Sequence, residues 1–206
     1  MIKDGGGFTL VEMLVTLTIF GIVTGSLVGL FVPLSAGFIS QNADADIQQT
    51  VRAAADLMVR ELRMAGFSSQ SESRFGIIEA KQNRVSFSAD WDDDGLITSS
   101  HRDDSSILVE SDLISYELDK ATLSLKRTTA ENTDDQSVQT LIGGPSDHMK
   151  MKDLAFTYFD QQGKETTIVD DIRSVGISLV AETPAGRKGF LKQSHQTQVK
   201  CRNLGL

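Results

Sequence analysis

The pattern of hydrophobic and polar positions divides the chain into three parts, of which the first is a long apolar run. No residue from Met13 to Ile39 carries an ionisable side chain, and Glu12 directly precedes this run. A helix needs about 20 mostly apolar residues to cross the hydrocarbon core of a bilayer. The stretch from Met13 to about Leu34 is therefore predicted to form a transmembrane helix.

The second part, residues 40–66, is predicted to continue as an amphipathic helix. Apolar residues recur there at the spacing of one helix face; they are Ile47, Val51, Ala54, Met58, Leu62 and Ala65. Gly66 is a typical stop, because glycine readily adopts the left-handed conformation that ends many helices. We expect one helix with a membrane or filament-core half, residues 8–39, and an amphipathic half, residues 40–66.

The third part, residues 67–206, is predicted to be a β-rich globular domain, because apolar and polar residues there tend to alternate. The expected strands are Arg84 to Ala89, Leu113 to Asp119, Ala121 to Arg127, Leu154 to Asp160, Ile172 to Glu182 and Thr197 to Leu204. A hairpin is expected about Asp119-Lys120, and loops at Ser68 to Arg74, Asn132 to Ser137 and Thr183 to Gly189. The predicted fold class is α+β, with a long N-terminal helix packed on a C-terminal antiparallel sheet.

The first residues place small side chains before the apolar run. A secretory signal peptide has a basic leader, an apolar core of about 7 to 15 residues and then a small-residue cleavage site. Here the polar leader Met1-Ile2-Lys3-Asp4 is followed at once by Gly5, Gly6 and Gly7. Cleavage after Gly7 would leave the apolar helix on the mature protein.

The hexapeptide Gly7-Phe8-Thr9-Leu10-Val11-Glu12 resembles the cleavage and methylation motif of type IV prepilins and of type II secretion pseudopilins. The resemblance implies that residues 1–7 are a leader, which a prepilin peptidase removes by cutting between Gly7 and Phe8. It also implies N-methylation of Phe8, a role for Glu12 in filament assembly and a pilin-like fold.

Physical chemistry supports a special role for Glu12. A carboxylate in hydrocarbon costs about 2.5 to 3.5 kcal/mol on insertion scales, so it is normally paired with a cation. Cleavage creates an ammonium group on Phe8, and methylation keeps an amine charged, so the ammonium of one subunit can pair with Glu12 of a neighbour. The alternative is that Glu12 lies at the membrane interface and is stabilised by the positive N-terminal end of its own helix.

The apolar run contains glycines at four-residue spacing and one proline. Gly21, Gly25 and Gly29 share one helix face, where small residues permit close helix packing in an apolar medium. The alternative is that glycine is simply common in membrane helices. Pro33 is expected to kink or locally break the helix, because it lacks an N–H group and its ring clashes with the preceding turn.

Two further segments narrow the resemblance. Val51 to Phe67 and Val199 to Leu204 resemble the helix end and the last strand of PilW-type minor pilins. The resemblance implies a non-enzymatic minor pilin that takes part in pilus assembly, initiation or a tip complex. Implied partners are prepilin peptidase, the major pilin, other minor pilins or pseudopilins and the inner-membrane assembly platform. The implied location is the bacterial inner membrane, in a single pass with the C-terminal domain in the periplasm, and then the extracellular filament.

Two alternatives stay open. A J-type pseudopilin of type II secretion shares the leader and the β-rich domain. A protein of another class would sense calcium or bind a surface, with the filament as its carrier.

Composition excludes several functions. The chain has 20 basic and 28 acidic residues, a net charge of −8, which argues against nucleic acid as a partner. Its one cysteine, Cys201, has no partner for an internal disulfide and is expected to be packed in the domain. The catalytic motifs HExxH, GxSxG, the P-loop and GxGxxG are absent, and the three histidines are scattered, so no enzymatic activity is expected.

One acidic stretch suggests a cofactor. Asp90, Asp92 and Asp94, followed by Gly95, match the first half of a calcium-binding loop, in which alternate carboxylates converge on the ion. The second half does not match, because His101 stands where an EF-hand has its bidentate glutamate. The stretch is therefore either part of a calcium site of another kind or a solvated acidic loop.

Overall fold

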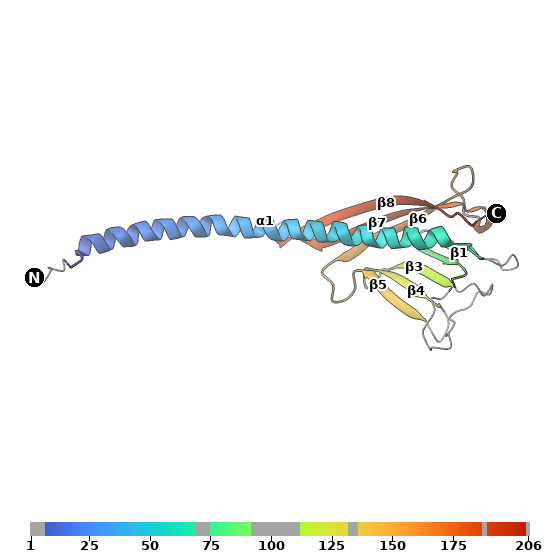
Figure 1. The fold of residues 1–206 in the computed structure, drawn as a ribbon, viewed down its shortest axis with the longest axis horizontal. Helices are drawn as coiled ribbons and strands as arrows, with labels where there is room; N and C mark the ends of the chain where they lie inside the picture. Colours follow the sequence, from blue (N-terminus) through green and yellow to red (C-terminus); the bar gives the residue numbers. More distant parts are fainter. Residues whose placement is uncertain (1–6, 69–74, 92–111, 132–135, 187–188, 205–206) are drawn as a thin grey trace, which may run out of the picture. The chain divides into compact units, whose positions relative to one another are not determined.

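The computed structural model describes residues 7–68, 75–91, 112–131, 136–186 and 189–204. The backbone forms two compact units, Met1–Asn42 and Ala43–Leu206. One helix, α1 (Leu10–Met64, 55 residues), begins in the first unit and ends in the second. The rest of the second unit is mostly β-structure (Figure 1).

The part of α1 in the first unit has the length and the apolar composition of a membrane-crossing helix, and the side chains of its most apolar stretch are exposed. The helix also continues through Pro33, so a break there is not found, whereas a kink at Pro33 stays a prediction. Proline removes one N–H group from the backbone ladder, and the cooperative bonds of the neighbouring turns can hold a long helix together across it.

The β-strands form two antiparallel sheets. The first sheet has five strands in the order β1-β2-β3-β4-β5, and the second has three in the order β6-β7-β8. The first contains β1 (Ile77–Lys81), β2 (Arg84–Ser88), β3 (Leu113–Asp119), β4 (Ser124–Thr129) and β5 (Ser137–Ile142). The second contains β6 (Lys150–Phe159), β7 (Ser174–Pro184) and β8 (Phe190–Lys200), with the 3-10 turn η1 (Val169–Asp171) before β7. The fold class is α+β, as predicted.

Several strand boundaries differ from the prediction. The hairpin of β3 and β4 turns over residues 120–123, because the Asp119 carboxylate accepts a hydrogen bond from the Ala121 N–H (2.8 Å) and stabilises a longer turn. β8 ends at Lys200 and begins seven residues before the predicted Thr197, since it pairs with the whole length of β7. The prediction missed β1 and β5, and it assigned Ser137, the first residue of β5, to a loop. It also assigned Thr183 and Pro184 to a loop, although β7 continues to Pro184.

The core of the second unit is a single hydrophobic cluster that joins α1 to both sheets. The predicted helix face is confirmed: its six residues are at most 5% exposed. They pack in one cluster with Phe87, Tyr116 and Leu154 from three different strands. At Gly66 the backbone has a φ of +80°, and a β-carbon there would lie 2.6 Å from the side chain of Leu204, so this position requires glycine.

A charged group is buried where α1 meets the first sheet. The carboxylate of Glu61 accepts hydrogen bonds from Arg127 (2.8 Å to its Nη2) and from the Tyr116 hydroxyl. Burial raises the pKa of Tyr116, and the nearby Glu61 charge raises it further. Burial disfavours the charged form of Arg127, but its contacts with Glu61 outweigh this and raise its pKa. The three side chains fix the rotation of α1 against β3 and β4.

We expect Glu61→Leu to lower the free energy of unfolding by about 3 kcal/mol, because Arg127 then keeps a buried charge without a counter-ion. The double variant that carries both Glu61→Leu and Arg127→Leu should lose less free energy of unfolding than Glu61→Leu alone, since no unpaired charge remains. Denaturant unfolding of the two single variants and the double variant measures this coupling. Additive losses would contradict the pairing.

Candidate processing and assembly site

The predicted cleavage site lies on an open, non-helical segment. Residues 7–9 precede α1 without regular structure, and the side chain of Phe8 is 85% exposed. A β-carbon added to Gly7 would meet nothing within 4 Å. No part of the described structure therefore blocks access of a peptidase to the bond between Gly7 and Phe8.

The first turn of α1 is closed by a reciprocal cap between Thr9 and Glu12. The Glu12 carboxylate accepts a hydrogen bond from the Thr9 N–H (3.3 Å), and the Thr9 hydroxyl accepts one from the Glu12 N–H (3.3 Å). This is a capping box, which satisfies two N–H groups that the helix ladder leaves unpaired. Threonine followed three residues later by glutamate is the sequence pattern typical of this cap, which was not among the predicted features.

The cap gives Glu12 a partner within its own chain. It supports the alternative in which Glu12 is stabilised by the positive end of its helix. A capped carboxylate still has free lone pairs, so the cap leaves capacity for an ammonium group from a neighbour. The role of Glu12 in assembly therefore stays a prediction, as does cleavage between Gly7 and Phe8.

The glycine face is open in a single chain. β-Carbons added to Gly21, Gly25 and Gly29 would meet nothing within 4 Å. Helix packing through these glycines, and through the neighbouring Pro33, also stays a prediction.

The predicted calcium ligands are only partly described. Asp92 and Asp94 lie outside the described residues. Asp90 is 1% exposed, and its carboxylate accepts a hydrogen bond from the Ser68 hydroxyl (3.2 Å). Asp112 is also 1% exposed, and its carboxylate accepts a hydrogen bond from the backbone N–H of Trp91 (3.0 Å). Within the described ranges no group of three metal-ligating side chains comes together.

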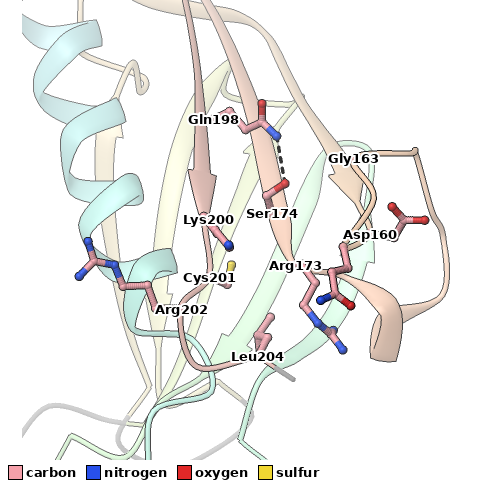
Figure 2. Close-up of a pocket in the computed structure, with 10 residues that line it drawn as sticks. Asp160, Gly163, Arg173, Ser174, Gln198, Lys200, Cys201, Arg202 and Leu204 are labelled. Carbon is pink, nitrogen blue, oxygen red and sulfur yellow. Dashed lines mark hydrogen bonds between the residues drawn. The ribbon is translucent and has the colours of Figure 1, made fainter. Parts of the chain in front are cut away.

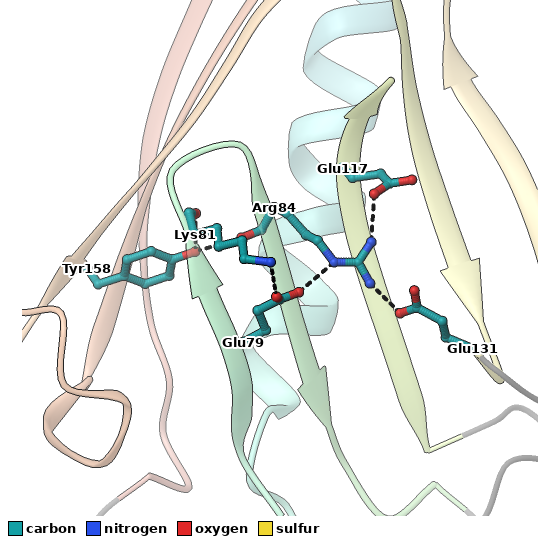
Figure 3. A network of polar contacts seen from close by, with 6 residues as sticks. All are labelled: Glu79, Lys81, Arg84, Glu117, Glu131 and Tyr158. Atoms are coloured by element: carbon teal, nitrogen blue, oxygen red, sulfur yellow. Dashed lines mark hydrogen bonds and ion pairs between the residues drawn. The ribbon is translucent and has the colours of Figure 1, made fainter. Parts of the chain in front are cut away.

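A second group of carboxylates surrounds Arg84 rather than a metal ion. The guanidinium group pairs with Glu79 and Glu117 at 2.6 Å each and also with Glu131 (Figure 3). Hydrogen bonds from Lys81 and then from Arg84 lower the pKa of Glu79. Because the cations are built into the protein, this cluster stabilises the first sheet and is not an open ligand site.

A cleft of about 520 Å³ lies at the C-terminal end of β8, and its basic side chains do not converge on one point. Figure 2 shows the guanidinium groups of Arg173 and Arg202 pointing to opposite sides of Lys200. Arg173 donates hydrogen bonds to the backbone carbonyl groups of Asp170 and Ile172, at 2.8 Å each. Cys201 beside them is 2% exposed, and burial raises its pKa to about 11, so its thiol is packed and protonated at neutral pH.

Comparison with known proteins gives matches for both the N-terminal segment and the β-rich unit. Residues 40–201 match the family model described as prepilin peptidase-dependent protein B, and residues 3–28 match that of the prokaryotic N-terminal methylation motif. Among solved structures, a type IV-like pilin from Thermus thermophilus has a similar fold, with a TM-score of 0.51 and 12% sequence identity. The similarity covers 78% of this chain and 98% of that pilin, and at this identity it shows the fold alone. A search of curated proteins gives no match. The chain belongs to the prepilin peptidase-dependent protein B family of type IV pilin-like proteins.

Proposed function

We propose that this protein is a minor pilin of a type IV pilus, processed by prepilin peptidase and used in pilus assembly, initiation or a tip complex. The observation that carries the proposal is the placement of the motif. Gly7 and Phe8 lie on an exposed, non-helical segment directly before an exposed apolar helix. The family match to a prepilin peptidase-dependent protein supports the processing step.

In the proposed sequence of events, α1 anchors the precursor in the inner membrane with the β-rich unit in the periplasm. The peptidase removes residues 1–7, and the new amino group of Phe8 is methylated. The mature subunit then leaves the membrane for a filament in which apolar helices of the major pilin and of other minor pilins pack together. The inner-membrane assembly platform would drive this transfer.

Glu12 has two partners in this proposal. Before assembly its carboxylate caps the helix through the Thr9 N–H. In the filament it also pairs with the Phe8 ammonium of an adjacent subunit, because opposite charges attract strongly where water is excluded. This ion pair stabilises an incoming subunit at the correct axial position, whereas a misplaced subunit leaves a carboxylate unpaired.

A J-type pseudopilin of type II secretion is the nearest alternative. It has the same leader and the same kind of fold, so the two functions differ in which subunits the protein joins. Recovery of the protein in sheared surface pili favours the pilus, whereas a secretion defect without loss of pili in a deletion strain favours the pseudopilin.

The calcium-binding alternative is retained as a second proposal because of one observation. Asp90 and Asp112, which lie on either side of the segment 91–111 that contains Asp92 and Asp94, are both buried. A cation held by this segment would offset the repulsion between its carboxylates.

The first test concerns Gly7. We expect Gly7→Glu to abolish cleavage, because a peptidase cutting beside a membrane must approach the backbone closely. The substitution should leave the fold intact, since the position is open. Mass measurement after co-expression with and without prepilin peptidase detects the product: the parent should lose its leader only with the enzyme, and the variant in neither case. A mature N-terminus at Phe8 in the variant would refute the cleavage assignment.

The second test separates the two roles of Glu12. We expect Glu12→Leu and Glu12→Gln to be inserted and cleaved normally but to reach sheared pili at about one tenth of the parent level, since a lost charge pair of about 1.4 kcal/mol already changes an equilibrium tenfold. Glutamine can still form the capping box.

The matched control for this test is Thr9→Val, which removes the hydroxyl half of the cap and keeps the carboxylate. It should reach pili at the parent level. If Glu12→Gln assembles normally and Thr9→Val does not, Glu12 serves assembly through the cap and the charge pairing is wrong.

The third test concerns calcium. At about a hundred times its dissociation constant, a ligand adds about 2.7 kcal/mol to the folded state. We therefore expect calcium to raise the melting temperature of the full-length protein in detergent by several degrees relative to excess chelator. The double variant Asp92→Ala with Asp94→Ala should lose this shift. Identical melting curves for the parent in both conditions would leave a solvated acidic loop.

A further inference from the structure

The second sheet has one covered edge and one open edge. At β6, loop and turn residues bond the backbone that faces away from β7: the Phe156 N–H donates to the Gln82 carbonyl oxygen (2.7 Å), and the Tyr158 carbonyl oxygen accepts from the Thr166 N–H (3.0 Å). β8 forms the other edge, and Figure 1 shows it as the outer strand beside β7. It is 11 residues long, whereas β1 and β5, the edges of the first sheet, have 5 and 6 residues.

The register shows which backbone groups of β8 face this edge. In an antiparallel sheet, alternate residues of a strand bond to opposite neighbours. The backbone groups of Phe156 and Tyr158 point away from β7, so those of the residue between them point toward it. The partner of that residue in β7 is even-numbered, so the even-numbered residues of β7 bond to β6. The odd-numbered residues of β7 bond to odd-numbered residues of β8. The N–H and C=O groups of the even-numbered residues therefore point outward; these are Phe190, Lys192, Ser194, Gln196, Gln198 and Lys200.

These outward backbone groups are almost without partners in the described part of the chain. The Gln193 side-chain amide lies 3.5 Å from the Ser194 carbonyl oxygen, a weak contact made by a neighbouring residue. All six even-numbered residues are exposed. An open strand of this length without proline is a template for another strand, and proteins usually shorten or cover such an edge.

The side chains along the edge define what would complement it. β8 contains two lysines and no acidic residue, although the whole chain has a net charge of −8. Glu182, which lies opposite Lys192, is already paired with Lys152 at 2.6 Å. Lys200 has no ion-pair partner among the described residues. At the other end, Phe190 is 69% exposed, which makes it the most exposed large apolar side chain described in the second unit.

We propose that β8 is a docking edge for an extended, acidic segment of another pilin-like subunit, which adds to the sheet as a fourth strand. The proposal rests on the proposed function, in which this protein assembles with other subunits. Backbone hydrogen bonds supply affinity in this mode of recognition, and side chains at alternate positions supply specificity. The segment carries carboxylates opposite Lys192 and Lys200, about 26 Å apart for eight residues of strand, and an apolar side chain opposite Phe190.

A second copy of this chain fits the edge less well. Because β8 has no acidic residue, no register of one β8 on another pairs a lysine with a carboxylate. In the antiparallel register that sets Gln196 opposite itself, Lys192 would face Lys200, and like charges directly opposite are destabilising. In the centred register, about His195, each lysine would face a residue without a carboxylate. An acidic partner strand satisfies the same backbone groups and both ammonium groups.

The test uses the full-length mature protein in detergent and, as probes, the other pilin-like subunits of the same bacterium, each purified in the same detergent. At least one subunit should bind, and its binding should slow amide exchange at Lys192, Ser194, Gln196 and Gln198 by tenfold or more. Residue-resolved hydrogen exchange measures this. The odd-numbered amides of β8 should be protected with or without the partner, because β7 already bonds to them.

The variant Gln196→Pro removes an outward N–H without breaking the ladder to β7, and Gln196→Ala is its matched control. We expect Gln196→Pro to weaken binding about tenfold or more and Gln196→Ala to bind like the parent. If the proline variant melts early, Lys192→Glu with Lys200→Glu is the second variant, with an expected loss of about tenfold at low salt.

Any of the following results would overturn the proposal: no subunit that binds, binding that leaves the outward amides unprotected, or equal binding by Gln196→Pro in a normally folded variant. A dimer of this chain that Gln196→Pro dissociates would also overturn it in favour of a second copy. Cleavage of the leader should be unchanged in every β8 variant. A cleavage defect in the parent would count against the proposed function, whereas normal cleavage with no edge-dependent binding would count against the docking edge alone.

Discussion

Burial of one face of α1 between Ile47 and Ala65 is the constraint on which the second unit depends. This face supplies a row of side chains to a core that also takes residues from both sheets, so neither sheet has a complete core without the helix. Apolar burial is non-directional and does not by itself fix how a helix is rotated. The buried contact of Glu61 with Arg127 adds that direction, because any other rotation would leave a charge unpaired in the interior. The helix is thus held both by the burial of its apolar face and by one specific ion pair.

The N-terminal part of the same helix follows a different rule. Its apolar side chains are exposed in a single chain, which suits a bilayer or a bundle of like helices and is unfavourable in water. Polar groups at its start therefore matter more than they would in water. The capping box between Thr9 and Glu12 pairs two backbone N–H groups that hydrocarbon would leave unsatisfied. The same carboxylate is then in place for a neighbour's ammonium, so a group that stabilises the subunit also serves assembly in our proposal.

The β-rich unit shows how an acidic protein distributes its charge. Around Arg84, three glutamates are compensated within the fold, and this part of the surface needs no ligand. β8 has the opposite composition, with lysines and no carboxylates along an open edge. Along β8 the local charge is therefore positive, opposite in sign to the net charge of −8. In our proposal, a partner that recognises this subunit therefore binds the edge of the second sheet and not the acidic surface elsewhere.

The sequence by itself determined the features that local patterns encode: the order of polar N-terminus, apolar run and amphipathic face, the stop near Gly66, the resemblance to pilins and the α+β class. It also held the capping box, since Thr9 and Glu12 are three residues apart. The tertiary structure alone decided β5, whose residues are mostly exposed and show no burial alternation, and the true extent of β8, whose central residues are polar throughout. It alone brought Arg84 to Glu117, 33 positions away, and Glu61 to Arg127, 66 positions away. Such strands and pairs form because a neighbouring strand supplies hydrogen bonds or because the core buries the side chains. The neighbour is distant in the sequence, so the local pattern of apolar and polar residues does not reveal it.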